Sequence, residues 1–216
     1  MRRQHGVILA LDEIDPVKAR SVASAVAPHV DAIKINWPLV LSAGPAMITE
    51  LAELRPVICD FKLADIPNTN RLITEQAIGR GADGVIVQGF PGMDSVKAVV
   101  NAAAGAAVFV VTEMSHPGGQ EFTAPVADRI ARMAVEAKAS GVIAPATRPG
   151  RISEIRKIVG QLSILAPGVG VQGGSAADAI RAGADYVIVG RSIYASPDPA
   201  KAAREISEEV RSVLKK

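Results

Sequence analysis

Three charged residues of alternating sign stand close together in the sequence, just after a short apolar run. The run at residues 57–60 ends in Asp60, and Lys62 and Asp65 follow it. Side chains alternate between the two faces of a strand, so Asp60 and Lys62 point the same way, and Asp65 falls in the next turn. Because a charged side chain is rarely buried without a partner, these residues form either a surface ion pair or a functional pair facing the interior.

Further charged side chains belong to two other apolar runs and favour the functional interpretation. Asp12 follows the run at residues 7–11, and Lys34 lies within the run at residues 32–35. A lysine flanked by carboxylates keeps its charge, because nearby anions raise its pKa. Such a lysine is a poor Schiff-base nucleophile and a well-placed proton donor. The cluster therefore suits delivery of a proton to a carbanion.

Other kinds of catalytic site are not indicated by the sequence. His5, His29 and His116 are scattered, and no set of histidines and carboxylates has the spacing of metal ligands. With a single cysteine, Cys59, the chain can form no internal disulfide and no zinc site built on cysteines. Neither a Gly-x-Ser-x-Gly nucleophile turn nor a dinucleotide fingerprint is present. We therefore expect no metal site.

Two glycine-rich stretches in the last quarter of the chain have the composition of an anion-binding site. One covers residues 167–174, and the other is Gly190 followed by Arg191. Glycines let backbone N–H groups approach an anion, a helix N-terminus adds partial positive charge, and Arg191 adds a fork of donors. Either stretch alone could simply turn the chain, but the two together predict a phosphate site.

The elements that must position these residues form a repeating pattern of strands and helices. Apolar runs predict strands at residues 7–11, 32–35, 57–60, 84–87, 107–111, 141–144, 163–165 and 186–189. Ala-rich amphipathic stretches predict helices at residues 16–26, 45–54, 70–80, 93–103, 125–138, 151–159, 176–182 and 199–214. Eight such units predict parallel strands in a single (β/α)8 TIM barrel over residues 1–216, with a doubly wound open sheet as the alternative. In the barrel, active sites lie at the carboxyl ends of the strands.

Composition excludes several classes of protein. The 216 residues carry a net charge of +2 without a basic block, and only 3% are aromatic, so we expect no binding to nucleic acid. No apolar segment reaches the length needed to span a membrane, and the N-terminal apolar run is too short for a signal peptide. The composition therefore predicts a cytoplasmic protein that does not interact with membranes.

Nearly the whole chain resembles the orotidine 5′-monophosphate decarboxylase family, and its short archaeal form most of all. Each motif is modest, but the ordered set is highly specific. The motifs are Ala10-Leu11-Asp12, Ile33-Lys34-Ile35, Asp60-Phe61-Lys62-Leu63-Ala64-Asp65-Ile66-Pro67-Asn68-Thr69, Glu113-Met114-Ser115-His116-Pro117-Gly118, Pro167-Gly168-Val169-Gly170-Val171-Gln172-Gly173-Gly174 and Val189-Gly190-Arg191-Ser192.

The resemblance implies a reaction and a role for each residue of the charged cluster. Orotidine 5′-monophosphate would lose CO₂ to give uridine 5′-monophosphate, the last step of de novo UMP synthesis, without a metal or organic cofactor. Lys62 would protonate C6, and Asp60 would sit against the scissile carboxylate. Lys34 and Asp12 would hold the ribose hydroxyls, with Lys34 also joining the charge network.

The resemblance also implies residues that bind the ends of the substrate and residues shared between two subunits. Ser115 would contact the pyrimidine, and Gln172 and Arg191 would bind the phosphate under a loop formed by residues 169–174. Asp65, a member of the catalytic set, and Thr69 would reach across a homodimer into the partner's site. The remaining expected substrate-binding residues are Pro167, Val169, Gly173 and Gly190.

Two rival functions stay open on the sequence. A magnesium-dependent hexulose-phosphate synthase or keto-gulonate-phosphate decarboxylase would share the Asp-x-Lys-x-x-Asp motif. Those enzymes are similar to one another in carrying a metal-binding glutamate at the position where this chain has Lys34. A lysine at that position would repel Mg²⁺. A non-catalytic barrel that binds a phosphorylated metabolite would keep the glycine-rich loops and Arg191, but it would have no reason to keep paired charges inside.

Overall fold

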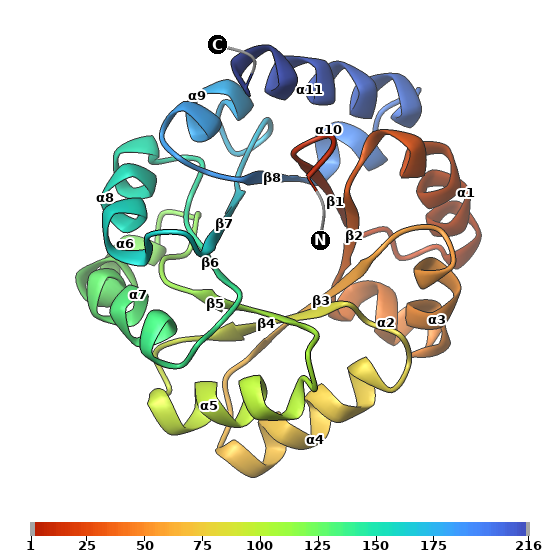
Figure 1. The fold of residues 1–216 in the computed structure, drawn as a ribbon. Helices are drawn as coiled ribbons and strands as arrows, with labels where there is room; N and C mark the ends of the chain where they lie inside the picture. The colour runs from red at the N-terminus through yellow and green to blue at the C-terminus, as the bar shows by residue number, and fades with distance from the viewer. Residues whose placement is uncertain (1–2, 215–216) are drawn as a thin grey trace.

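The computed structural model of the chain describes residues 3–214 and contains a closed barrel of parallel strands (Figure 1). Each strand pairs with the next along the chain, and the last pairs with the first. The strands are β1 (Val7–Leu11), β2 (Ala32–Ile35), β3 (Val57–Leu63), β4 (Gly84–Gln88), β5 (Ala107–Val111), β6 (Gly141–Ile143), β7 (Ser163–Pro167) and β8 (Tyr186–Val189). The predicted (β/α)8 barrel is confirmed, and the open-sheet alternative is wrong.

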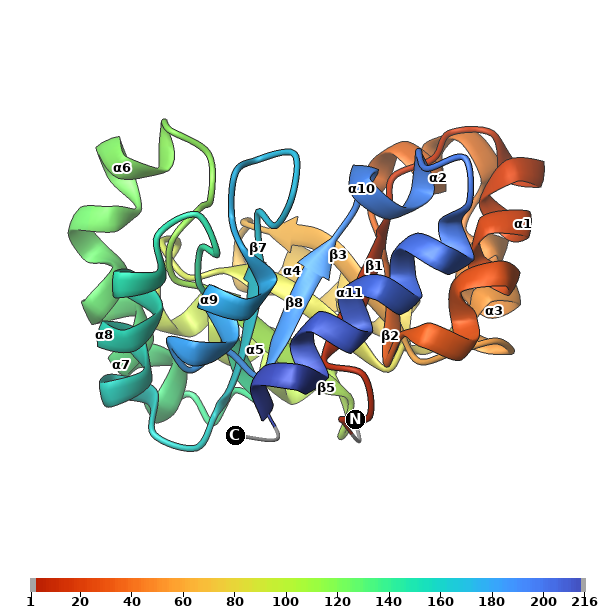
Figure 2. The ribbon, with the colours of Figure 1, turned by 90° about the horizontal axis from the view of Figure 1, so that it is seen from above.

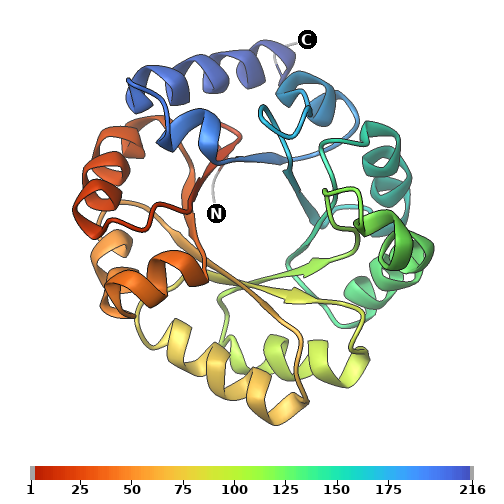
Figure 3. The same ribbon diagram turned by 180° about the vertical axis from the view of Figure 1, so that it is seen from behind.

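Helices surround the ring of strands on its outside (Figures 1 and 3). The α-helices are α1 (Pro16–Val26), α2 (Trp37–Ala43), α3 (Ala46–Ala52), α4 (Pro67–Ile78), α5 (Met93–Ala102), α6 (Gly119–Phe122), α7 (Ala127–Glu136), α8 (Pro149–Val159), α9 (Ala176–Arg181), α10 (Arg191–Tyr194) and α11 (Pro199–Leu214). Two short 3₁₀ helices are η1 (Ala27–His29) and η2 (Ala124–Val126). Within residues 3–214, no helix combines the length and apolar character needed to cross a membrane.

Several predicted boundaries match the structure, and the differences lie mainly at the carboxyl ends of the strands. The bounds of β1, β2, β5 and β8, and of α1 and α11, are as predicted. Strand β3 continues to Leu63 instead of ending at Asp60. Helices α2, α6 and α10 were not predicted. They have only seven, four and four residues, too short for a helical period of apolar residues to stand out.

The apolar residues form two layers, because neighbouring side chains on a strand point to opposite faces. On β1, Val7, Leu9 and Leu11 pack outward against the helices, whereas Ile8 and Ala10 point into the barrel. The other strands follow the same alternation. The inner layer consists of Ile8, Ala10, Ala32, Ile58, Ile86, Phe109, Val111, Ile143, Leu165, Tyr186 and Ile188.

Parallel pairing places all the carboxyl ends of the strands at one end of the barrel. Figure 2 shows this end at the top, where α6, α10 and the long loop after β7 lie, and α11 ends at the opposite side. The inner apolar layer closes the barrel below that end. Charged residues one position further along the inward-facing rows of β1, β2 and β3 therefore lie above an apolar floor.

A close contact between a glycine and the backbone of the next strand gives a stability prediction at Gly141 on β6. A Cβ at this position would collide with the Ser163 carbonyl oxygen on β7 and would lie 2.9 Å from the Phe109 ring. A backbone atom cannot move aside as a flexible side chain can. We expect Gly141→Ala to lower the free energy of unfolding by about 1–3 kcal/mol, as measured by urea denaturation.

Gly150→Ala is the matched control for this substitution. Gly150 lies in the first turn of α8, and a Cβ there would have nothing within 4 Å. Alanine is a better helix former than glycine, so this variant should be unchanged or more stable by up to about 1 kcal/mol. A Gly141→Ala protein as stable as Gly150→Ala would contradict the packing described for β6 and β7.

Candidate active site

A cavity of about 610 Å³ opens at the carboxyl ends of the strands. It brings together ten of the residues predicted from the sequence, and three others, Asp65, Thr69 and Gly173, do not line it. The predicted residues in its wall are Asp12, Lys34, Asp60, Lys62, Ser115, Pro167, Val169, Gln172, Gly190 and Arg191. Lys34, Asp60 and Lys62 lie on β2 and β3, and Asp12 directly follows β1. The glycine-rich loops, with Arg191, follow β7 and β8.

The Asp60 carboxylate lies at the centre of a chain of alternating charges. The Lys62 ammonium donates to both of its oxygens, at 2.9 and 2.8 Å. The Lys34 ammonium lies 3.0 Å from Asp60 Oδ2 on its other side and 3.7 Å from Asp12 Oδ1. Burial differs within this charge network: the side chains of Lys34 and Asp60 are 6% and 7% exposed, whereas that of Lys62 is 37% exposed. The network thus runs from the barrel interior to the open cavity.

Their charged neighbours keep the buried Asp60 and Lys34 side chains ionised at neutral pH. Burial alone would raise the pKa of Asp60, but the two neighbouring ammonium groups lower it below the usual value. Burial alone would likewise lower the pKa of Lys34, and Asp60 and Asp12 raise it above the usual value. The pair therefore stays ionised in a place where a single charge would not.

The backbone of β3 is distorted where it presents the lysine. The pairing register with β4 shifts between Cys59 and Leu63, and Lys62 has a φ of 44°, in the left-handed region. A non-glycine residue held there costs about 1–2 kcal/mol, so its surroundings must fix it. Trp37 supplies such a contact, since its ring stacks on Phe61 at 4.4 Å and its Nε1 donates to the Phe61 carbonyl at 3.1 Å.

Asp65 lies away from the charge network of its own chain. The sequence placed it at the same strand end, but the chain turns outward there and the residue is exposed. Its Oδ1 accepts from the Ile66 N–H at 2.7 Å, and its backbone is held by Asn70 and Ser95. Among residues 3–214 it makes no ion pair. Thr69, on the first turns of α4, also lies outside the cavity wall.

The glycine-rich loop after β7 folds back on itself. Val169 and Gly174 form an isolated bridge, and the Gly174 N–H donates to the Gly168 carbonyl at 3.0 Å. Gly170 has a φ of 76°, and a Cβ there would collide with the Ser192 hydroxyl, so a glycine is required where the β7 and β8 loops meet. The loop holds Gln172 beside the opening and Gly173 at its turn.

The loops after β5 and β7 touch through polar side chains. Ser115 Oγ donates to Gln172 Oε1 at 2.9 Å. Gly168 packs between them, since a Cβ at this residue would lie 3.3 Å from the Ser115 Cβ and 3.5 Å from Gln172 Oε1. The residue expected to meet the base and the residue expected to meet the phosphate are therefore in direct contact.

Comparison with known proteins identifies the family of the chain. Residues 6–206 match the Orotidine 5′-phosphate decarboxylase / HUMPS family. The chain belongs to this family. The orotidine 5′-phosphate decarboxylase of Methanococcoides burtonii is 58% identical over 213 residues, covering 97% of this chain and 99% of that protein.

Solved structures of orotidine 5′-monophosphate decarboxylases agree closely with this fold. The enzyme of Methanocaldococcus jannaschii complexed with the inhibitor BMP has a TM-score of 0.91 and 45% identity, covering 94% of this chain and 97% of that one. The enzyme of Pyrococcus horikoshii has a TM-score of 0.89 and 49% identity, covering 95% and 99%. The short archaeal form of the family, expected from the motifs, is confirmed.

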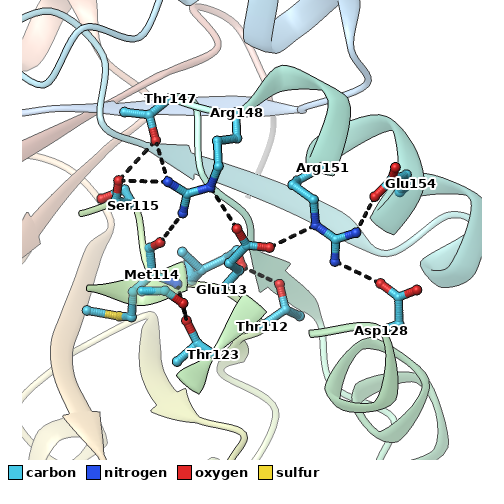
Figure 4. Close-up of polar contacts among 12 residues, drawn as sticks. Thr112, Glu113, Met114, Ser115, Thr123, Asp128, Thr147, Arg148, Arg151 and Glu154 are labelled. Carbon is cyan, nitrogen blue, oxygen red and sulfur yellow. Dashed lines mark hydrogen bonds and ion pairs between the residues drawn. The ribbon is translucent and has the colours of Figure 1, made fainter. Parts of the chain in front are cut away.

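Sequence reasoning missed a second charged network in this decarboxylase-family barrel. Glu113, after β5, is fully buried and lies in ion-pair contact with Arg148 and Arg151 (Figure 4). Its place just beyond a strand end was a usable signal. The two arginines carried none, because they are 35 and 38 residues away in the sequence.

The charge network gives a pH-dependent stability prediction for Asp60→Asn. The pKa of Asp60 is lowered on folding, so its contribution to stability is present above the unfolded value of about 3.9 and is lost as the pH falls through the folded value. The variant leaves two ammonium groups without their shared carboxylate, and we expect a loss of about 3 kcal/mol or more between roughly pH 5 and 9. Urea denaturation at several pH values measures it.

Asp178→Asn is the control for that experiment, because Asp178 is exposed and its ion pair within residues 3–214 is with Arg181 on its own helix. We expect this variant to lose no more than about 0.5 kcal/mol. The deficit of Asp60→Asn should shrink as the pH falls below about 4. A deficit that stays constant into strong acid would show that Asp60 does not stabilise the fold through its charge.

Proposed function

We propose that this protein catalyses the decarboxylation of orotidine 5′-monophosphate to uridine 5′-monophosphate and CO₂. The observation that carries the proposal is the Lys62–Asp60–Lys34–Asp12 network in a cavity whose other side carries Arg191 and the glycine-rich loops. A proton donor and an anion site at opposite sides of one cavity fit a phosphorylated substrate that must gain a proton at a carbon. The names of the relatives support the same reaction.

Lys62 is the proton donor in this proposal. The bond between C6 and the carboxylate breaks, its electron pair stays on C6, and the Lys62 ammonium gives that carbon a proton as CO₂ leaves. Asp60 holds the Lys62 ammonium in place through two hydrogen bonds and opposes the substrate carboxylate, since both carboxylates carry negative charge. Lys62 is partly exposed, so solvent can restore its proton after each turnover.

Asp12 and Lys34 hold the hydroxyl groups of the ribose. Asp12 Oδ1 is buried and accepts no hydrogen bond from the part of the chain that the structure describes. A buried oxygen that accepts no hydrogen bond costs free energy, and a ligand hydroxyl in the cavity could donate the missing hydrogen bond. Lys34 lies next to it and stays charged because its ammonium contacts both carboxylates.

The phosphate is bound by Gln172 and Arg191. The guanidinium of Arg191 offers a fork of donors to phosphate oxygens. Gly190 leaves room for the anion near backbone N–H groups, and Pro167 and Val169 form the cavity wall beside it. Gly173 lies outside this wall and would meet the anion only when the loop closes. Binding energy from the phosphate is available to close the loop over residues 169–174, far from the reacting carbon.

The position of Lys34 argues against a magnesium-dependent activity. The family includes HUMPS enzymes, so family membership alone does not decide between the two reactions. In this chain the Lys34 ammonium fills the space between Asp12 and Asp60, at 3.7 and 3.0 Å. A divalent cation placed between the same carboxylates would meet a positive charge there. The cofactor-independent decarboxylation is therefore the better candidate.

The active unit in this proposal is a homodimer. Ile66, Leu72 and Leu41 are 65%, 47% and 80% exposed, and an apolar groove of about 350 Å³ lies beside Leu72. Exposed apolar surface of this kind marks an interaction site, and a second copy of the chain is its occupant. Helix α4 carries both Leu72 and Thr69, so seating it on a partner would bring Asp65 and Thr69 to the partner's cavity.

A pair of variants separates the chemical step from phosphate binding. Lys62→Ala should abolish turnover of orotidine 5′-monophosphate and should still bind uridine 5′-monophosphate. Turnover is measured by ultraviolet absorbance in excess EDTA. Arg191→Ala should weaken the binding of uridine 5′-monophosphate about 10-fold or more and leave the binding of uridine almost unchanged, because the substitution removes a contact to the phosphate alone.

Wild-type protein that leaves orotidine 5′-monophosphate unchanged under these conditions would rule out the proposed reaction. Activity on a sugar phosphate after Mg²⁺ is restored would then assign the chain to the rival group. Turnover by Lys62→Ala close to that of the wild type would remove only the role of the proton donor. Equal losses for nucleotide and nucleoside in Arg191→Ala would remove the phosphate site.

Mixing two inactive variants tests the shared site. If Asp65 acts in the partner's cavity, Lys62→Ala and Asp65→Asn each give dimers without a complete site. Random exchange makes half the dimers mixed, and one of their two sites is complete, so about a quarter of wild-type activity should return. Light scattering checks that both variants form dimers. A mixture that stays inactive despite exchange would place Asp65 in its own subunit's site, and an Asp65→Asn protein that is active by itself would remove Asp65 from both sites.

A further inference from the structure

Glu113 is a fully buried carboxylate that the proposed chemistry does not use. It follows β5 and belongs to the wall of the cavity, but it makes no contact with the Lys62–Asp60 network. Its Oε1 accepts from Arg148 Nε at 2.7 Å, and its Oε2 accepts from Arg151 Nε at 2.9 Å (Figure 4). A buried charge is retained at a cost unless each of its oxygens has a partner, and here each oxygen has one.

The Arg148 guanidinium reaches beyond Glu113 to the backbone of the next two residues. It donates to the Met114 carbonyl at 2.5 Å and points to the Ser115 carbonyl at 3.4 Å. Thr147 Oγ1 also donates to the Ser115 carbonyl, at 3.0 Å. Figure 4 shows Arg148 between the Glu113 carboxylate and these carbonyls. One planar side chain therefore fixes the loop relative to the buried carboxylate.

These contacts replace strand pairing at the point where β5 has ended. The Met114 N–H donates to Thr123 Oγ1 at 3.1 Å, so both polar backbone groups of Met114 are bound to side chains. The Ser115 side chain then bonds to the glycine-rich loop by donating to Gln172 Oε1. The place of the Ser115 hydroxyl in the cavity follows from how the backbone at residues 114–115 is held.

We propose that Glu113 is a positioning residue for the base-binding end of the cavity. It orients Arg148, and Arg148 sets the backbone that presents Ser115. This inference rests on the proposed function, in which Ser115 meets the pyrimidine. It assigns to Glu113 no contact with substrate, and it makes ligand affinity at the base end depend on an ion pair inside the protein.

The same carboxylate has a second arm that supplies a matched control. Arg151 contacts Glu113 but otherwise pairs with Asp128 on the neighbouring helix α7 and with Glu154 on its own helix. Among residues 3–214 it donates to no carbonyl of the loop after β5. Replacing Arg151 thus disturbs the buried charge as replacing Arg148 does, without releasing the backbone that presents Ser115.

The test compares Arg148→Lys with Arg151→Lys by calorimetry. A lysine keeps the charge beside Glu113 but cannot span the carboxylate and the Met114 carbonyl as the planar fork does. We expect Arg148→Lys to weaken the binding of uridine 5′-monophosphate about 10-fold. The binding of ribose 5-phosphate, which lacks the base, should weaken by less than about 2-fold. Arg151→Lys should leave both affinities within about 2-fold, although both variants lower the midpoint of thermal unfolding.

A double substitution tests whether the effect passes through Ser115. If it does, Arg148→Lys should weaken uridine 5′-monophosphate no further in a Ser115→Ala background. Glu113→Gln, where it folds, should resemble Arg148→Lys in its selective loss at the base end. Equal effects of the two arginine variants, equal losses for both ligands, or a full additional loss in the Ser115→Ala background would overturn the proposal. These measurements need no turnover, so their outcome is independent of whether orotidine 5′-monophosphate is decarboxylated.

Discussion

The carboxylate of Asp60, held between two ammonium groups, is the interaction on which the rest of the structure depends. A single charge at this depth would lose too much hydration to stay ionised, so the carboxylate needs oppositely charged partners. Lys62 and Lys34 contact it from two sides, and Asp12 balances Lys34 in turn. This arrangement holds the Lys62 side chain at the edge of an open cavity, where the proposed reaction needs a proton donor.

The barrel makes that arrangement possible through its register. Lys34 pairs with Ala10 on one side and Ile58 on the other, so the inward rows of three neighbouring strands lie level. Asp12 and Asp60 are each two residues beyond those partners, on the same face. Alternation along a strand therefore brings together charges from positions 12, 34 and 60 above a layer of apolar side chains. The fold makes β1, β2 and β3 neighbours, and the alternation of side chains along each strand determines which of them face the same cavity.

Much of this was predictable because the signals are local. Eight apolar runs between helical stretches defined the barrel, and its geometry placed the candidate site at the strand ends. The bulge at Lys62 was not predictable, because its left-handed φ is held by Trp37 on another element. The outward turn of the chain at Asp65 was not predictable for a similar reason, since it depends on contacts with Asn70 and Ser95. The contacts of Glu113 with Arg148 and Arg151 were not predictable either, because these residues are distant in the sequence and meet only in the folded chain. The roles of these residues stay predictions.

The two walls of the cavity are held in different ways, and this difference fits their proposed tasks. The loop that presents Ser115 is tied to a buried carboxylate through Arg148, so its position is fixed before any ligand arrives. The loop over residues 168–174 is held by bonds among its own glycines, and Val171 on it is 61% exposed. A unit bonded mainly to itself can close over a phosphate at little internal cost. A closing loop needs a fixed surface to close against, and Ser115, bonded to Gln172, supplies it.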